Sequence, residues 1–125
     1  MADADGTLTF EKFWRWVLEH PNCILRASAY DATLFDGPDF HWELYDEEDG
    51  RAVVQLLKGK TMVGEILIDR QELLHVSASP DVDEGHKGCW LFELVGGTRA
   101  EHFPVAHFLV SHGMEQVAGH QALKH

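Results

Sequence analysis

The spacing of apolar residues changes twice along the chain. Near the N-terminus they recur every three to four positions and form one stripe: Phe10, Phe13, Trp14, Val17 and Leu18. This is the spacing of an amphipathic helix. A hydroxyl from Thr7 or Thr9 can cap its start, and Pro21 ends it because the residue before a proline is disfavoured in the helical conformation. The pattern predicts a helix over residues 8–20.

Between residues 22 and 95 apolar and polar positions alternate, which is the pattern of strands that bury one face. Gly50 and Gly59 mark tight hairpin turns. Neighbouring strands with such short connections are antiparallel, because parallel pairs need long crossovers. Residues 33–35 either extend the first strand or form a short one. The other predicted strands cover residues 23–29, 40–45, 51–57, 62–68, 73–79 and 89–95.

The segment after residue 97 is again interpreted as helical. Pro104 suits the first position of a helix, and Gly113 can end it. Four residues between them share one face: Val105, Phe108, Leu109 and His112. The predicted fold class is α+β, an antiparallel meander sheet of five or six strands with N-terminal and C-terminal helices packed on one face. Residues 1–113 are expected to form a single domain, followed by a weakly ordered tail over 114–125.

The chain is acidic. Its 125 residues include 21 Asp and Glu against 10 Lys and Arg, which gives a formal net charge of −11. Nucleic acids and anionic membrane surfaces are therefore not expected as partners, because binding them needs clustered Lys and Arg. The charge favours solubility or a basic protein partner. Nine histidines would remove most of this charge if all were protonated.

The N-terminal residues 1–5 are acidic and lack the basic and apolar regions of a signal peptide. No apolar stretch approaches the roughly 20 residues that span a bilayer. The expected location is the cytoplasm. Cys23 and Cys89 each lie in an apolar run, where a reduced, buried thiol that packs as a small hydrophobe is the expectation. A disulfide between them would require their two strands to be adjacent.

No complete catalytic, metal or nucleotide motif is present. Gly59-Lys60-Thr61 resembles the end of a phosphate-binding loop, but Val54 stands where the upstream glycine is needed. The His102, His107 and His112 side chains recur every five residues and cannot converge on one ion from a single helix. We therefore assign no catalytic residue, metal ligand or cofactor from the sequence.

The first functional hypothesis is a non-catalytic, acidic protein-interaction module, chaperone- or adaptor-like and able to form a homodimer. Its partner would be a basic or partly unfolded protein segment, or a second copy of the chain. The size, acidic charge and helix–strands–helix order resemble those of type III secretion chaperones. The candidate surface combines aromatic side chains with acidic loops: Trp16, His41, Glu43, Tyr45, Asp46, Glu47, Glu48, Asp49, Asp81, Asp83 and Glu84.

Two alternative hypotheses belong to other classes. A small enzyme or ligand-binding domain would place a polar site between helix and sheet, built from His41, Glu43 and Tyr45 or from His75. A metal-linked or pH-linked assembly would instead depend on the many histidines. The sequence does not choose between these hypotheses.

Overall fold

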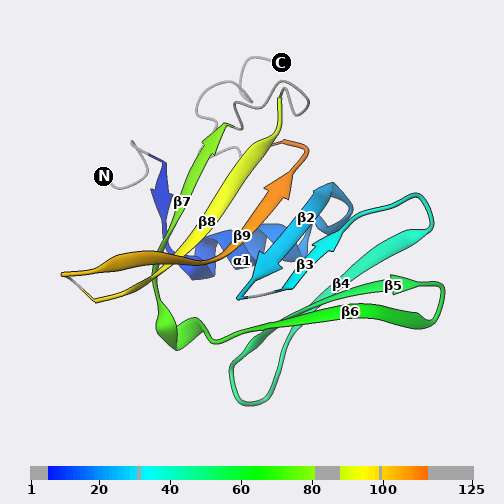
Figure 1. Cartoon of the computed structure of the whole chain (residues 1–125), viewed down its shortest axis with the longest axis horizontal. Helices are drawn as coiled ribbons and strands as arrows, with labels where there is room; N and C mark the ends of the chain where they lie inside the picture. Colours follow the sequence, from blue (N-terminus) through cyan, green and yellow to red (C-terminus); the bar gives the residue numbers. More distant parts are fainter. Residues whose placement is uncertain (1–5, 31, 81–87, 99, 113–125) are drawn as a thin grey trace.

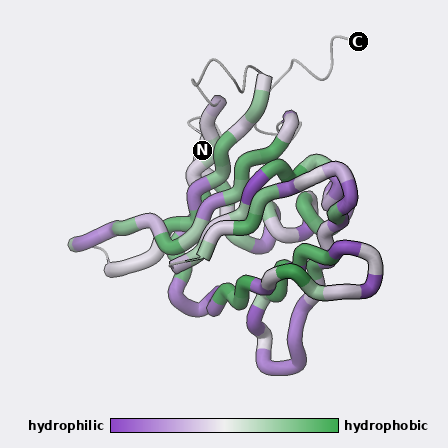
Figure 2. Tube along the Cα trace, turned by 45° about the vertical axis from the view of Figure 1, so that its right-hand side comes forward, coloured by the Kyte–Doolittle hydropathy of each residue, from purple (hydrophilic) through white to green (hydrophobic). Residues whose placement is uncertain are grey.

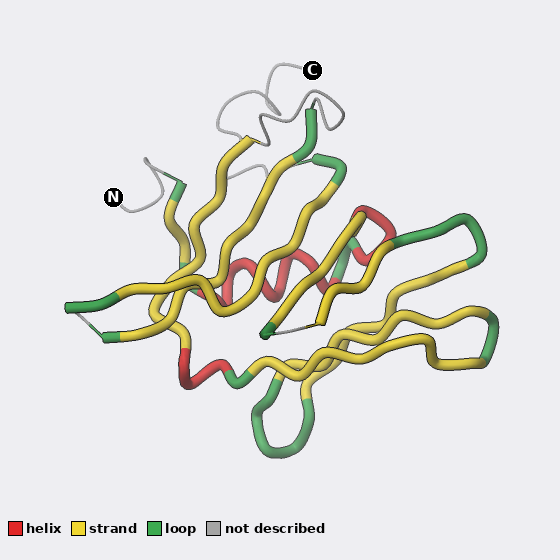
Figure 3. Tube along the Cα trace, in the orientation of Figure 1, coloured by secondary structure: helices red, strands yellow, loops and turns green. Residues whose placement is uncertain are grey.

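The computed structural model describes residues 6–30, 32–80, 88–98 and 100–112. Within these ranges strands dominate, joined by one α-helix, α1 (Phe10–Leu18), and by two short 3₁₀ turns, η2 (Pro21–Cys23) and η3 (Arg70–Glu72) (Figure 3). None of the helices described is long and apolar enough to cross a membrane.

The strands form two separate antiparallel sheets rather than one meander. The six-stranded sheet has the order β1 (Thr7–Leu8), β7 (Leu73–Pro80), β8 (Trp90–Gly97), β9 (His102–Val110), β2 (Ile24–Ala29) and β3 (Ala32–Phe35). The three-stranded sheet has the order β4 (Phe40–Asp46), β5 (Ala52–Lys58) and β6 (Thr61–Ile68). Figure 1 shows helix α1 across one face of the larger sheet, with the smaller sheet beside β2 and β3.

Helix α1 forms for the reasons its sequence indicates. The Thr9 hydroxyl accepts a hydrogen bond of 3.1 Å from the Lys12 backbone N–H and caps the first turn. The apolar stripe buries Phe10, Phe13, Trp14 and Val17, and the helix ends before Pro21. The observed helix is shorter than predicted by two residues at each end, where termini fray.

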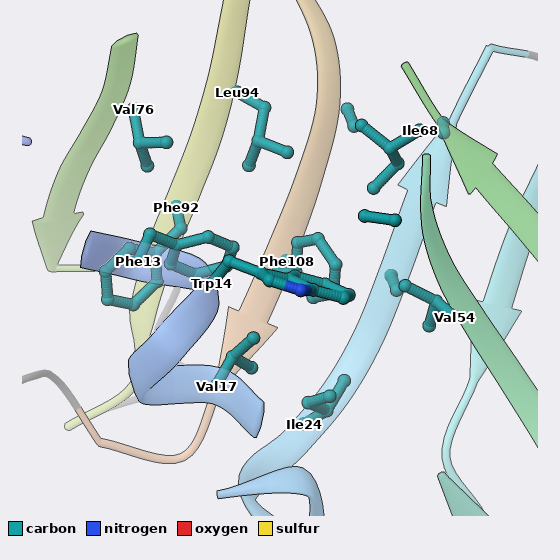
Figure 4. Close-up of a cluster of buried hydrophobic side chains, with 14 of the residues drawn as sticks. Phe13, Trp14, Val17, Ile24, Val54, Ile68, Val76, Phe92, Leu94 and Phe108 are labelled. Atoms are coloured by element: carbon teal, nitrogen blue, oxygen red, sulfur yellow. The ribbon is translucent and has the colours of Figure 1, made fainter. Parts of the chain in front are cut away.

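The core lies between the two sheets and the helix. The Phe13 ring packs against Phe92 and Phe108 of the larger sheet, with ring centroids 5.0 and 5.2 Å apart. Figure 4 shows Trp14 extending past Phe108 toward Val54 of the smaller sheet, so α1 joins both sheets in one apolar cluster. In Figure 2 the strands and helix carry the hydrophobic residues, while the loop between β4 and β5 is mostly hydrophilic.

The predicted C-terminal helix from Pro104 is wrong, because this segment is strand β9. β9 pairs with β8 on one side and with β2 on the other. Its last three residues are all buried, whereas a surface helix would bury only one face. Pro104 is accommodated beside a register shift between Leu94 and Val95 of β8, where a missing N–H is tolerated. Tertiary pairing overrides the weak helical spacing. The predicted tail over 114–125 lies outside the described residues.

The two sheets meet where β6 contacts β2 and β3. Gly64 of β6 lies directly under the Leu34 side chain of β3, and a Cβ at position 64 would collide with its Cδ2. Both cysteines are free thiols and half-buried. Cys23 precedes β2 and Cys89 precedes β8, and β9 lies between those two strands.

Candidate functional site

Part of the predicted interaction surface lies together on β4. His41, Glu43 and Tyr45 alternate with inward-facing residues, and the His41 Nε2 and Glu43 Oε2 atoms are 3.6 Å apart. The Tyr45 hydroxyl accepts a hydrogen bond of 3.4 Å from Gln55 Nε2, which also donates to Glu65 at 2.8 Å. Tyr45, Gln55 and Glu65 are thus linked by hydrogen bonds across the three strands of the smaller sheet, and His41 and Glu43 form a separate pair.

The acidic residues at the end of β4 and in the loop after it are largely engaged in the fold. Asp46 accepts a hydrogen bond of 2.8 Å from Trp14 Nε1 and pairs with Arg70. The next loop residues, Glu47 and Asp49, both bind Arg51, at 3.1 and 2.8 Å. The Arg51 backbone N–H and its guanidinium hold the pKa of Asp49 below its usual value.

Of the four carboxylates from residue 46 to residue 49, Glu48 alone lacks an ion pair among the described residues. These residues line a hollow of about 510 Å³ with Tyr45. The loop therefore presents less unpaired negative charge than its sequence indicates.

The remaining predicted surface residues lie elsewhere. Trp16 is half-buried against the larger sheet, where its ring stacks on His20 with centroids 4.4 Å apart and lies 5.9 Å from Phe92. Three predicted acidic residues lie outside the described part of the chain: Asp81, Asp83 and Glu84. The predicted surface thus combined Trp16, which packs on the larger sheet, with β4 residues of the smaller sheet.

A different site, centred on Tyr30, was missed by the sequence analysis. Tyr30 directly follows β2, next to the pair of Ala29 with Ala32 where β2 and β3 meet. Tyr30 has a φ of 57°, a backbone conformation uncommon for a bulky side chain. Its ring is 60% exposed rather than buried in the core. The signal available in the sequence was an aromatic residue at a turn position that favours Asn or Gly.

Tyr30 lies at the edge of a cavity of about 550 Å³, which we call the Tyr30 pocket. The Tyr30 hydroxyl donates a hydrogen bond of 3.1 Å to Glu72 Oε1. Phe103 of β9, 51% exposed, supplies a second aromatic ring. The lining combines the β2–β3 turn, the end of η3 and the β8–β9 hairpin: Tyr30, Glu72, Gly97, Thr98, Phe103, Pro104 and Val105.

Carboxylates surround the Tyr30 side chain. Its partial burial, and then the hydrogen bond and negative charge of Glu72, raise the pKa of the Tyr30 phenol above its ordinary value of 10.0. Glu65 lines a neighbouring hollow of about 470 Å³ on which Tyr30 also borders. Arg70 precedes Glu72 by two residues but binds Glu11 and Asp46 instead. An aromatic ring bordered by carboxylates is suited to bind a cation.

The three histidines at five-residue spacing, His102, His107 and His112, lie at different places along and after β9. His102 lies at the start of β9, with its ring 5.8 Å from that of His75, whereas His107 lies mid-strand and accepts a hydrogen bond of 3.1 Å from Arg26 Nε. His112 follows the end of β9. In the described part of the chain, no three His, Cys, Asp or Glu side chains are grouped so that they could hold a metal ion.

Comparisons with known proteins provide no relative. No protein-family model, no curated protein and no solved structure matches the chain. Strand β9 also replaces the helix on which the resemblance to type III secretion chaperones partly depended. Function must therefore be argued from the site alone.

Proposed function

We propose that this chain is a non-catalytic interaction module that binds a lysine or arginine side chain of a protein partner in the Tyr30 pocket. The observation that carries the proposal is the exposed Tyr30 ring, whose hydroxyl is held by Glu72 at the edge of the cavity. An aromatic face attracts a cation through its quadrupole. A carboxylate beside it adds a charge-assisted hydrogen bond.

The dimensions of the pocket support this proposal. A volume of about 550 Å³ is within the range of small-ligand sites, and it easily holds one long side chain. Phe103 and Pro104 contribute apolar surface against which the methylene groups of lysine or arginine can pack. Glu72 then meets the charged end of that side chain.

The charge of the whole chain supports a basic partner. A formal net charge of −11 attracts cationic proteins over distances beyond direct contact and raises their association rate. Arg51 and Arg70 are already paired with carboxylates of their own chain, so these two cations do not compete for Glu72. The expected partner is a protein segment that exposes a lysine or arginine.

The test measures binding of fluorescein-labelled hexa-arginine and hexa-lysine peptides by fluorescence polarisation, with hexa-glutamine as the uncharged control. Glu72→Gln and Glu48→Gln form a matched pair, because each removes one charge from an exposed glutamate. We expect Glu72→Gln and Phe103→Ala to weaken binding of the basic peptides about fivefold or more. Glu48→Gln should weaken it less than about twofold.

Equal losses for Glu72→Gln and Glu48→Gln would mean that the diffuse acidic field binds the peptides, which contradicts a role for the pocket. Failure of either basic peptide to bind better than hexa-glutamine would also refute the proposal. Light scattering of the same proteins tests self-association. A dimer that Glu72→Gln dissociates would identify a second copy of the chain as the source of the basic side chain.

A further inference from the structure

A second side-chain cluster lies at the opposite end of β9 from the Tyr30 pocket. Cys23 ends η2 and His112 follows β9. The Ser111 backbone N–H donates a hydrogen bond of 2.9 Å to the Cys23 carbonyl, which fixes these two chain segments side by side. As a result, Cys23 Sγ lies 2.9 Å from His112 Nε2.

Two aromatic rings lie against the exposed imidazole of this pair. The His112 ring is edge-on to Trp16 and to His20, with centroids 5.8 and 5.9 Å apart and interplanar angles of 86° and 82°. His20 Nδ1 is 2.7 Å from the Trp16 carbonyl oxygen. Because a carbonyl only accepts, His20 Nδ1 donates and the orientation of this ring is fixed. The two neighbouring rings in turn hold the His112 ring beside the thiol.

The arrangement has the features of an activated nucleophile. A thiol lies within hydrogen-bond reach of an imidazole, and further groups orient that imidazole. Sulfur attacks as the thiolate, so a base that accepts its proton increases its reactivity. Cys89 is also half-buried and free, but no described imidazole contacts it. Cys89 can therefore serve as the reference thiol against which the reactivity of Cys23 is compared.

We infer that Cys23 is a reactive thiol that undergoes exchange with small disulfides. His112 Nε2 accepts the thiol proton while the Cys23 sulfur attacks one sulfur of the disulfide. The disulfide bond breaks, a mixed disulfide forms on Cys23, and the leaving thiolate takes the proton from His112 and departs as a thiol. The Cys23 sulfur is oxidised and the leaving sulfur is reduced, so no other oxidant is needed. This site shares no residue with the Tyr30 pocket and does not depend on the proposed function.

The test uses 2,2′-dithiodipyridine, an uncharged disulfide that the acidic protein does not repel, and follows the absorbance of the released thiopyridone. Cys89→Ser leaves only Cys23, and Cys23→Ser leaves only Cys89. Each variant is measured both folded and unfolded in urea. We expect folded Cys23 to react about tenfold faster than the same thiol unfolded. Folded Cys89 should react more slowly than its own unfolded form.

The comparison with the unfolded chain separates activation from exposure, because accessibility alone cannot make a folded thiol faster than an unfolded one. His112→Gln in the Cys89→Ser background should reduce the folded rate to the unfolded rate or below, while the urea midpoint shows that the variant is folded. A folded Cys23 rate no higher than the unfolded rate overturns the inference without any histidine variant. A fast Cys23 that His112→Gln leaves unchanged overturns the role of the imidazole.

Discussion

Asp46 distinguishes a structural role from a binding role. The sequence predicts this carboxylate on an interaction surface, whereas in the structure it contacts side chains of its own chain. It accepts the indole N–H of Trp14 at 2.8 Å and pairs with Arg70. Trp14 is only 2% exposed. If Asp46 becomes alanine, the indole N–H cannot readily reach water.

The expected loss of stability follows from these two contacts of Asp46. A buried donor left without a partner costs about 1–3 kcal/mol. Loss of the exposed ion pair with Arg70 adds at most about 1 kcal/mol. We expect Asp46→Ala to lower the free energy of unfolding by about 2 kcal/mol, which is a large fraction of the stability of a single domain. Urea unfolding followed by tryptophan fluorescence measures it.

Glu48→Ala is the matched control, because Glu48 lies in the loop directly after Asp46 and has no ion pair among the described residues. It should change the unfolding free energy by less than about 0.5 kcal/mol. Trp14→Phe removes the N–H, so Asp46→Ala should cost less in that background. Equal losses for Asp46→Ala and Glu48→Ala would refute the reasoning and return Asp46 to the interaction surface.

Three further predictions concern titration and packing. Burial, and then a neighbouring guanidinium, lowers the pKa of His107 below 6.5. As the pH falls, the unfolded state therefore binds a proton before the folded state does, and the free energy of unfolding declines below about pH 6.5. His107→Gln should make this decline smaller, which urea unfolding at about pH 7 and pH 5 measures. In Tyr45→Phe, Tyr30 is the one remaining tyrosine, and its ultraviolet titration should have a midpoint above 10. Gly64→Ala should destabilise the fold by only about 1 kcal/mol, because the end of the half-buried Leu34 side chain can move away from the new Cβ, and the loss should vanish in the Leu34→Ala background, which differential scanning calorimetry measures.

The local elements were predictable because their causes are local. The Thr9 cap, the apolar stripe and Pro21 specify helix α1 within a few residues. The β4–β5 and β5–β6 hairpins follow from alternation and from Gly50 and Gly59, both of which have positive φ as their turns require. The expected strand over residues 73–79 is likewise present as β7.

The long-range arrangement was not predictable in the same way. The spacing of Val105, Phe108 and Leu109 fits one face of a helix, but it equally fits a strand that buries both faces. The choice depends on β8 and β2, and β2 is distant in sequence. The division into two sheets depends similarly on β3 and β4, which follow each other in the chain but do not pair.

The candidate sites were also only partly predictable from the sequence. Acidic residues 46–49 were selected for their charge, but charge alone does not reveal that Arg51 and Arg70 pair with three of them. Cys23 and His112 lie on segments that only the strand order brings together. The Asp46–Arg70 and Cys23–His112 contacts join residues that are distant in sequence, so patterns within one segment could not reveal them. Arg51 is close in sequence to Glu47 and Asp49, but charge alone does not specify that its side chain turns back to both.

Tyr30 supports the binding proposal because its position is unfavourable for the fold alone. A φ of 57° costs a non-glycine residue about 1 kcal/mol or more, and asparagine tolerates it better. The exposed ring gains little from burial, and a single exposed hydrogen bond to Glu72 contributes only about 1 kcal/mol. Tyr30→Asn should therefore leave the unfolding free energy unchanged or raise it, and should weaken binding of hexa-arginine. A marked loss of stability with binding retained would instead show that the ring serves the fold.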